Sequence, residues 1–306
     1  MLTLPAEISF GSAFVIYRWW CGGKYLAYEL APKATIIDAS IYDTVEQVHA
    51  SLPSGVRTFL FHLNITLTAR FPKGREELVG RLKSLAVRIL NENVTDISKN
   101  GIQKTCQEIG LPSTLAQHDG DEDELVIIKT DSNVACDSEY QLTAEDRSVL
   151  GLGEPVAFIR YSSDYKVLPR KDVPSDWWSD SSLICERFIT NSAERWYRAY
   201  KFLSRIVLCE FTSTDVIKKV SNSVVRRLWF VEIISNGWNV QEGDGSADPV
   251  LEQLVRFAAE VQLDFGTIDV MVDNAGVPYI IDLNSTPAYN HPIAGLIPYM
   301  QSVFHD

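Results

Sequence analysis

Three residues that could bind a metal ion lie close together in the segment TIDVMVDNAGVPYIIDLNSTP (267–287) of this 306-residue chain. Two apolar runs flank a turn at 273–276, which predicts a β-hairpin. The first run contains Asp269, and the second contains Asp282 and Asn284. Because side chains alternate between the two faces of a strand, Asp282 and Asn284 are expected to point the same way.

The length of the hairpin loop decides where Asp269 lies relative to Asp282. A four-residue loop, Asn274–Val277, pairs Asp273 with Pro278 and places Asp269 directly opposite Asp282. A two-residue loop moves Asp269 to a diagonal position on the same face, and a three-residue loop reverses its face. Directly opposed carboxylates have Cβ atoms about 4.5–5.5 Å apart and destabilise the strand pair.

A divalent cation between the two carboxylates would remove this repulsion. Two carboxylates and an amide carbonyl are hard oxygen ligands, which suit Mg²⁺ or Mn²⁺ and do not suit zinc. Mg²⁺ in proteins usually shares its coordination shell with substrate phosphates, so the pattern indicates a nucleotide site. The alternative is a one-sided hairpin whose acids face water.

Strand and helix patterns alternate along the rest of the chain, which indicates an α/β protein. Helices are predicted at Arg75–Leu90, within 91–112 and from Asp248, which would cap its helix with Pro249 in the first turn. Strands or strand pairs are predicted at Phe14–Tyr17, Ala34–Ile37, Thr58–Leu63, Leu125–Lys129, 155–168, Leu183–Ile189, Tyr200–Phe211 and Leu228–Ile234.

The hairpin pattern, D-x(12)-D-x-N running into N-x-x-P, resembles the metal-binding end of the ATP-grasp superfamily, in particular of RimK-like and D-alanine–D-alanine ligases. The resemblance implies an N-terminal α/β lobe (1–94), followed by two α+β lobes (95–182 and 183–306) that clamp ATP between them. It also implies ATP and Mg²⁺, or Mn²⁺, as cofactors, with Asp269, Asp282 and Asn284 as the metal ligands.

Two lysines are similar to the phosphate-binding lysines of this superfamily. Lys99 lies eleven residues before the turn Gly110-Leu111-Pro112, although Ser98 replaces the usual aspartate of the motif. Lys129 ends the strand LVIIKT, as the second lysine of the family does, with Thr130 in place of proline. In a chain with many acids, these lysines would neutralise the charge of a triphosphate.

The adenine-binding hinge of the family resembles Glu186-Arg187-Phe188-Ile189. By this resemblance Glu186 would accept a hydrogen bond from the adenine amino group, and Phe188 and Ile128 would sandwich the ring. Glu194 is the candidate ligand of the ribose. Arg198 in the strand WYR corresponds to an arginine of RimK-like ligases that lies near the phosphates.

The sequence departs from the family pattern at three places. The segment 130–140 (TDSNVACDSEY) has no glycine and three acids, where the family has a glycine-rich loop that closes over the phosphates. Thr267 stands where D-alanine–D-alanine ligases have an arginine that holds the acyl phosphate, and Arg226 or Arg227 are candidates to replace it. Asp282 is shorter than the usual glutamate.

The overall composition excludes several partner classes. The net charge of −12 disfavours nucleic acid and anionic membranes as partners. The five cysteines are scattered without a CxxC pair, and no run approaches about 18 apolar residues, which together predict a cytoplasmic protein. The expected partners are small-molecule or peptide carboxylate and amine substrates, and a homodimer is compatible with the sequence.

Three functions remain open at this point. The first is a ligase that uses ATP to convert a carboxylate into an acyl phosphate, which an amine then attacks to form an amide. The second is a phosphotransferase, for which His291 is the candidate phosphorylated residue. The third is a nucleotide-binding protein without turnover. Substrate specificity is expected to lie in 162–182, which contains Arg170, Trp177 and Trp178, and in RWWCGGKY (18–25).

Overall fold

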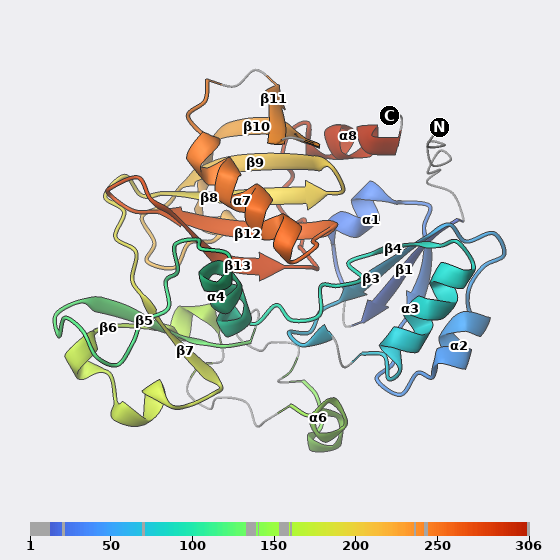
Figure 1. The fold of residues 1–306 in the computed structure, drawn as a ribbon, viewed down its shortest axis with the longest axis horizontal. Coiled ribbons are helices and arrows are strands. Elements are labelled where there is room, and N and C mark those ends of the chain that lie inside the picture. The colour runs from blue at the N-terminus through green and yellow to red at the C-terminus, as the bar shows by residue number, and fades with distance from the viewer. Residues whose placement is uncertain are drawn as a thin grey trace.

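The computed structural model describes residues 13–19, 22–68, 71–132, 139, 141–152, 159, 161–235, 237–241 and 244–304. These residues form a mixed α/β fold of one parallel and two antiparallel sheets, with helices on the faces of the sheets (Figure 1). The α-helices are α1 (Leu26–Leu30), α2 (Val45–Ala50), α3 (Arg75–Ser84), α4 (Lys99–Glu108), α6 (Ala144–Leu150), α7 (Asp248–Glu260) and α8 (Leu296–Gln301). Short 3-10 helices are η3 (Ser162–Asp164), η4 (Arg170–Asp172), η5 (Ser175–Trp178), η6 (Val220–Asn222) and η7 (Ser302–Phe304).

The N-terminal sheet is parallel and has the strand order β2-β1-β3-β4. Its strands are β1 (Phe14–Trp19), β2 (Thr35–Asp38), β3 (Thr58–Leu63) and β4 (Arg88–Leu90). Alternate residues of β1 serve two cores, because Val15 and Tyr17 pack with α2 and α3 while Phe14 and Ile16 pack toward the C-terminal sheet. The first three predicted strands are therefore confirmed.

The C-terminal sheet is antiparallel, in the order β11-β10-β9-β8-β12-β13. Its strands are β8 (Arg195–Phe202), β9 (Arg205–Thr212), β10 (Val224–Ile234), β11 (Gly237–Gln241), β12 (Phe265–Val272) and β13 (Pro278–Asn284). One face, which includes Ala199 and Ile268, is covered by α4 and α7. The other face, which includes Trp196 and Phe265, packs against the N-terminal sheet, α1 and α8.

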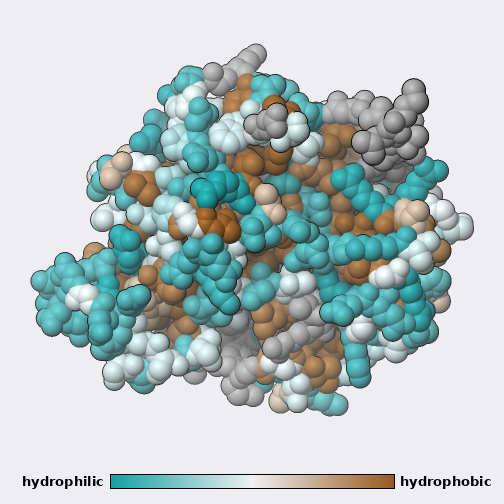
Figure 2. Space-filling view, viewed as in Figure 1, coloured by the Kyte–Doolittle hydropathy of each residue, from teal (hydrophilic) through white to brown (hydrophobic). Residues whose placement is uncertain are grey.

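A small antiparallel sheet, in the order β6-β5-β7, consists of β5 (Leu125–Thr130), β6 (Lys166–Pro169) and β7 (Leu183–Arg187). It lies at the lower left of Figure 1, beside β13 and α4. The space-filling view shows hydrophilic residues over its outer end (Figure 2). The family resemblance implied a boundary between the second and third lobes after residue 182. If the lobes are divided by sheet, β7 belongs with β5 and β6, and this boundary lies after Arg187.

Two predicted elements differ from those in the structure. The helix predicted at Arg75–Leu90 ends at Ser84, because Ala86 has a positive φ of 56° and Arg88–Leu90 pairs with β3. The strand predicted at Tyr200–Phe211 is instead parts of β8 and β9, which turn at Leu203-Ser204. Both errors have one cause, since an apolar pattern continues through a turn that carries neither glycine nor proline.

Two smaller predictions are also corrected. Asp248 is the first residue of α7 and Ala247 is its N-cap, with no capping side chain. The strand pair predicted at 155–168 lies partly outside the described residues, and its described part contains η3 and the beginning of β6. None of the helices in the described ranges has both the length and the hydropathy needed to span a membrane.

Candidate functional site

The hairpin of β12 and β13 places Asp269 directly opposite Asp282, as the four-residue loop predicted. The route to this register differs from the prediction. Val272 pairs with Pro278, so five residues connect the strands, and a β-bulge between Asp269 and Val270 restores the predicted pairing. Both carboxylates therefore lie on the face of the sheet that carries Arg198, the cross-strand neighbour of Asp269 on β8.

Arg198 forms a bidentate ion pair with Asp269. Its Nε lies 2.7 Å from Oδ1 of Asp269, and its Nη2 lies 2.7 Å from Oδ2. Burial alone would lower the pKa of Arg198, but the adjacent Asp269 outweighs this effect and the pKa is raised. The guanidinium thus offsets the like-charge repulsion in the hairpin, which the sequence had suggested a metal ion would do.

Among the described residues, Asp282 has no such ion-pair partner. Its Oδ1 atom is buried and accepts no hydrogen bond from them. Burial raises the pKa of Asp282, and the neighbouring Asp269 raises it further, while Lys99, Lys129 and Arg198 act in the opposite direction. A buried carboxylate oxygen without a partner is costly, so this position is suited to a cation that is bound from outside the chain.

Asn284 is half-buried and lies on β13 two residues after Asp282. Its Oδ1 accepts hydrogen bonds from the backbone N–H of Thr286 at 2.8 Å and from its hydroxyl at 3.2 Å. The Thr286 hydroxyl also lies 3.1 Å from Oδ1 of Asn64, which follows β3. The C-terminal end of the hairpin therefore contacts the carboxyl edge of the N-terminal parallel sheet.

Lys99 begins α4 and is buried beside the small sheet. Its Nζ donates to the backbone carbonyl of Ser132 at 2.6 Å. Burial lowers the pKa of Lys99, but the surrounding Tyr165, Asp282 and Glu186 more than compensate, and its pKa is raised. The ammonium is therefore held charged within the electrostatic reach of the unpartnered Asp282.

Lys129 and Glu186 lie on the neighbouring strands β5 and β7. Their side chains form a buried ion pair with 2.6 Å between Nζ and Oε2. Glu186 also accepts a short hydrogen bond from the hydroxyl of Thr114. Without a bound nucleotide, the residue predicted to bind phosphate and the residue predicted to bind adenine thus form an ion pair with each other.

The remaining hinge residues lie at the end of β7 and directly after it. The backbone N–H of Arg187 donates to Thr114 O at 2.6 Å, and that of Phe188 donates to Leu125 O at 2.9 Å. The Arg187 side chain is exposed and lies 3.0 Å from Glu124. Glu194 is exposed and has a positive φ of 56°.

A cavity of about 550 Å³ brings most of the predicted residues together. The predicted residues that line it are Lys99, Lys129, Glu186, Arg187, Phe188, Ile189, Glu194, Arg198, Asp269, Asp282 and Asn284. Ile127 lines the cavity in place of the predicted Ile128, whose side chain lies on the other face of β5 and packs in the core of the small sheet. The strand alternation that orients Lys129 toward the cavity thus also orients Ile127 toward it.

Several lining residues were missed by the sequence reasoning. They include Thr114, Met271, Asn274, Ile281 and the segment 214–219 with Lys218 and Lys219, whereas the lining residue Tyr165 lies within the predicted specificity segment 162–182. The lysine pair in an acidic chain was a usable signal. Ile281 had none, because the bulge that accommodates it is not encoded by a glycine.

Arg226 and Arg227 are not among the described residues that line this cavity. Arg227 pairs across β10 and β9 with Glu210, which in turn lies opposite Tyr197. Arg227 therefore lies on the face of the sheet opposite to Arg198, and its guanidinium forms an exposed ion pair with Asp244 at 3.2 Å. The β-bulge between Val225 and Arg227 interrupts the alternation on which a sequence-based assignment depends.

Other predicted specificity residues also lie elsewhere. Arg170 is buried and donates to the backbone carbonyls of Asp119 and Asp121, so it holds the acidic segment 119–124. Trp177 and Trp178 pack against the core of the small sheet. Most of the glycine-less segment 130–140, and Trp20 and Cys21 of 18–25, lie outside the described residues.

No protein-family model matches the sequence, and no curated protein is significantly similar to it. Solved structures do match. One is the ATP-grasp ligase PsnB complexed with a phosphomimetic variant of its minimal precursor, Mg and ADP; the match has 14% identity, covers 97% of this chain and 100% of that chain, and has a TM-score of 0.52. Another is an L-amino acid ligase from Bacillus licheniformis, with 9% identity, 95% and 69% coverage and a TM-score of 0.51. The chain therefore has the ATP-grasp fold, as its hairpin and lysines predicted.

Proposed function

We propose that this protein is an ATP- and Mg²⁺-dependent ligase that joins a carboxylate to an amine through an acyl phosphate. The observation that carries the proposal is that the cations Lys99, Lys129 and Arg198 line one cavity together with Asp282, whose buried Oδ1 has no hydrogen-bond partner among the described residues. The similar PsnB structure holds Mg and ADP, and another similar structure is that of an L-amino acid ligase, which supports the same chemistry here.

The residues present fit a magnesium ion. Within the described residues no group of three His, Cys, Asp or Glu side chains is suited to a metal. The proposed ligand set therefore includes an amide oxygen: it consists of Asp282, Asn284 and one oxygen of Asp269. The buried Oδ1 of Asp282 is the free donor. Bound there, Mg²⁺ would neutralise charge on the nucleotide phosphates.

The binding of ATP requires two rearrangements among these side chains. Glu186 must exchange part of its contact with Lys129 for the adenine amino group, which frees the Lys129 ammonium for a phosphate oxygen. Arg198 must release at least one oxygen of Asp269, and its freed N–H groups would then bind phosphate. Both side chains thus change partners without losing charge compensation.

The proposed reaction has two steps. A carboxylate oxygen of the first substrate attacks the γ-phosphorus, the bond to the β–γ bridging oxygen breaks, and ADP leaves. The amine then attacks the acyl carbon, loses a proton, and displaces inorganic phosphate to leave an amide. Lys99 and Arg198 would stabilise the charge on the transferred phosphoryl group, and no covalent enzyme intermediate is needed.

A nucleotide-binding protein without turnover is the second candidate, because both carboxylate oxygens of Asp269 are occupied by Arg198. A phosphotransferase that uses His291 is less favoured. That residue is exposed and is not among the described residues lining the cavity.

The test is ADP release from ATP and Mg²⁺ in the presence of panels of carboxylic acids and amines. The ligase proposal predicts ADP release that needs both substrates and disappears in Asp282→Ala and Arg198→Ala. Arg227→Ala is the matched control, since this arginine lies on the other face of the sheet, and it should retain activity. Bound ATP with no ADP release under any combination would support the second candidate, and phosphorylated acid accumulating without an amine would support a phosphotransferase.

A further inference from the structure

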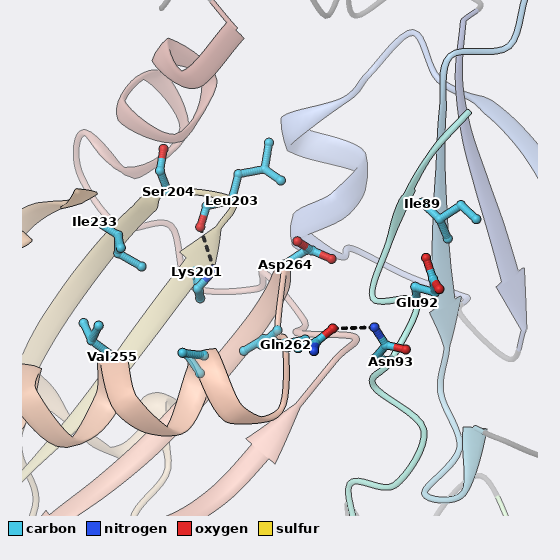
Figure 3. Close-up of a pocket in the computed structure, with 13 residues that line it drawn as sticks. Ile89, Glu92, Asn93, Lys201, Leu203, Ser204, Ile233, Val255, Gln262 and Asp264 are labelled. Atoms are coloured by element: carbon cyan, nitrogen blue, oxygen red, sulfur yellow. Dashed lines mark hydrogen bonds between the residues drawn. The ribbon is translucent and has the colours of Figure 1, made fainter. Parts of the chain in front are cut away.

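A second cavity, of about 400 Å³, lies at the opposite side of the C-terminal sheet and shares no lining residue with the first (Figure 3). Four segments that are distant in the sequence form its walls. They are the end of α7 with Gln262–Asp264, the β8–β9 turn at 201–204, Ile233 of β10, and the segment that contains Ile89 and Asn93. The cavity therefore lies where the N-terminal lobe meets the C-terminal sheet.

Lys201 supplies a buried positive charge to this cavity. Its side chain is 7% exposed, and it projects from the face of β8 opposite to Arg198. Its Nζ donates to the backbone carbonyl of Leu203 at 2.6 Å, and no other acceptor contacts it among the described residues. An ammonium has three protons, so two donors are left for a ligand.

Asp264 supplies the opposite charge. Its Oδ2 accepts a hydrogen bond from the backbone N–H of Asn91 at 2.9 Å. Lys201 and Asp264 affect each other's pKa, yet no direct ion pair joins them within the described chain. A buried cation and a carboxylate that face one cavity without touching leave room for a group that carries both complementary charges.

The remaining lining includes Glu92, whose carboxylate pairs with Lys83 at 2.6 Å, together with amides and an apolar surface. Asn93 and Gln262 form a hydrogen bond with each other at the N-terminal side of the cavity (Figure 3). Ile233 and Val255 line the opposite side as apolar side chains. A volume of about 400 Å³ lies in the range of small-molecule sites.

We propose that this cavity binds a free aliphatic α-amino acid. The ligand carboxylate accepts from the Lys201 ammonium, the ligand ammonium donates to Asp264, and the aliphatic side chain packs against Ile233 and Val255. A zwitterion fits better than a simple anion because the end of α7 and Asp264 place negative potential beside the lysine. These contacts all come from the C-terminal lobe, while Ile89 and Asn93 of the N-terminal lobe line the same cavity, which is separate from the nucleotide cavity.

The test is isothermal titration of the full-length protein with L-leucine, without ATP. The expected result is binding of one leucine per chain. 3-Methylbutylamine, which lacks the carboxylate, and 4-methylpentanoate, which lacks the amine, should each bind at least tenfold more weakly. Equal affinities for leucine and for either analogue would overturn the zwitterion assignment.

Two variants locate the bound leucine. Lys201→Met should weaken binding at least tenfold, and Ala259→Phe, which adds a ring at an exposed lining position, should block the cavity without altering Lys201. Asp282→Asn, in the other cavity, should bind leucine as the unmodified protein does. Undiminished binding in both cavity variants, or binding lost in Asp282→Asn, would overturn the proposal.

Discussion

Replacement of Lys201 by methionine should stabilise the protein at neutral pH. Burial lowers the pKa of Lys201 from its ordinary value of 10.5 to about 8. A tenfold change in proton affinity is worth about 1.4 kcal/mol, so the buried ammonium costs about 3 kcal/mol of unfolding free energy at pH 7. The lost hydrogen bond to the Leu203 carbonyl offsets about 1 kcal/mol of this. The expected net gain in Lys201→Met is about 2 kcal/mol.

The sign of this effect depends on pH in a defined way. Below pH 8 the lysine is protonated in both the folded and the unfolded chain, so the full cost is present. Between pH 8 and 10.5 the folded state holds fewer protons than the unfolded state, and the stability of the unmodified protein rises relative to the variant. The advantage of Lys201→Met should fall to about 1 kcal/mol at pH 9 and vanish near pH 10.

The assay is urea denaturation of both proteins at pH 7, 8, 9 and 10, compared through linear extrapolation. Lys104→Met is the control, because this exposed lysine has only a 3.8 Å contact with Glu108 and its loss should change stability by less than about 1 kcal/mol. A Lys201→Met protein that is less stable at pH 7 would refute the reasoning. A difference that does not change with pH would refute it equally.

Three further predictions concern buried polar groups. Arg198→Ala should lower the unfolding free energy by about 3 kcal/mol because Asp269 loses its bidentate partner, whereas Arg227→Ala should cost under about 1 kcal/mol in the same urea assay. Asn91→Ala should lower the unfolding free energy by about 3 kcal/mol, since the Asn91 side chain makes three hydrogen bonds with the backbone of Asp264 and Phe265. A urea midpoint equal to that of the unmodified protein would contradict this. Burial lowers the pKa of His62 to about 3, so stability should fall as the pH drops below 6.5; between pH 7 and 4.5 the unmodified protein should lose about 3 kcal/mol more than His62→Phe, and parallel losses would exclude this role.

The β12–β13 hairpin shows how much of a site can be predicted from local sequence patterns. Period-two alternation was sufficient to place Asp282 and Asn284 on one face, and the like charges correctly marked the segment as unusual. The opposition of Asp269 and Asp282 was also correct. The loop length was not, because a five-residue connection and a bulge together give the same register as a four-residue loop.

Residues selected by a strand-end or hinge pattern line the predicted cavity, whereas Arg226 and Arg227 do not. The first group lies on uninterrupted strands or directly after them, where the alternation of side chains predicts which face each residue occupies. Arg227 comes directly after a bulge, which interrupts this alternation, so its face cannot be predicted in the same way. In the same way, the partnership of Arg198 with Asp269 depends on the pairing of β8 with β12, which are separated by more than sixty residues.

The sequence alone determined the ATP-grasp fold and predicted eleven of the residues that line the first cavity, because short strands, turns and charged positions follow local rules. Only the tertiary structure decided which charges are already paired. Arg198 neutralises Asp269, whereas Asp282 keeps a buried oxygen that has no hydrogen-bond partner in the described part of the chain. The second cavity could not be predicted from the sequence, since Lys201 and Asp264 acquire their burial and their separation only when four distant segments pack together.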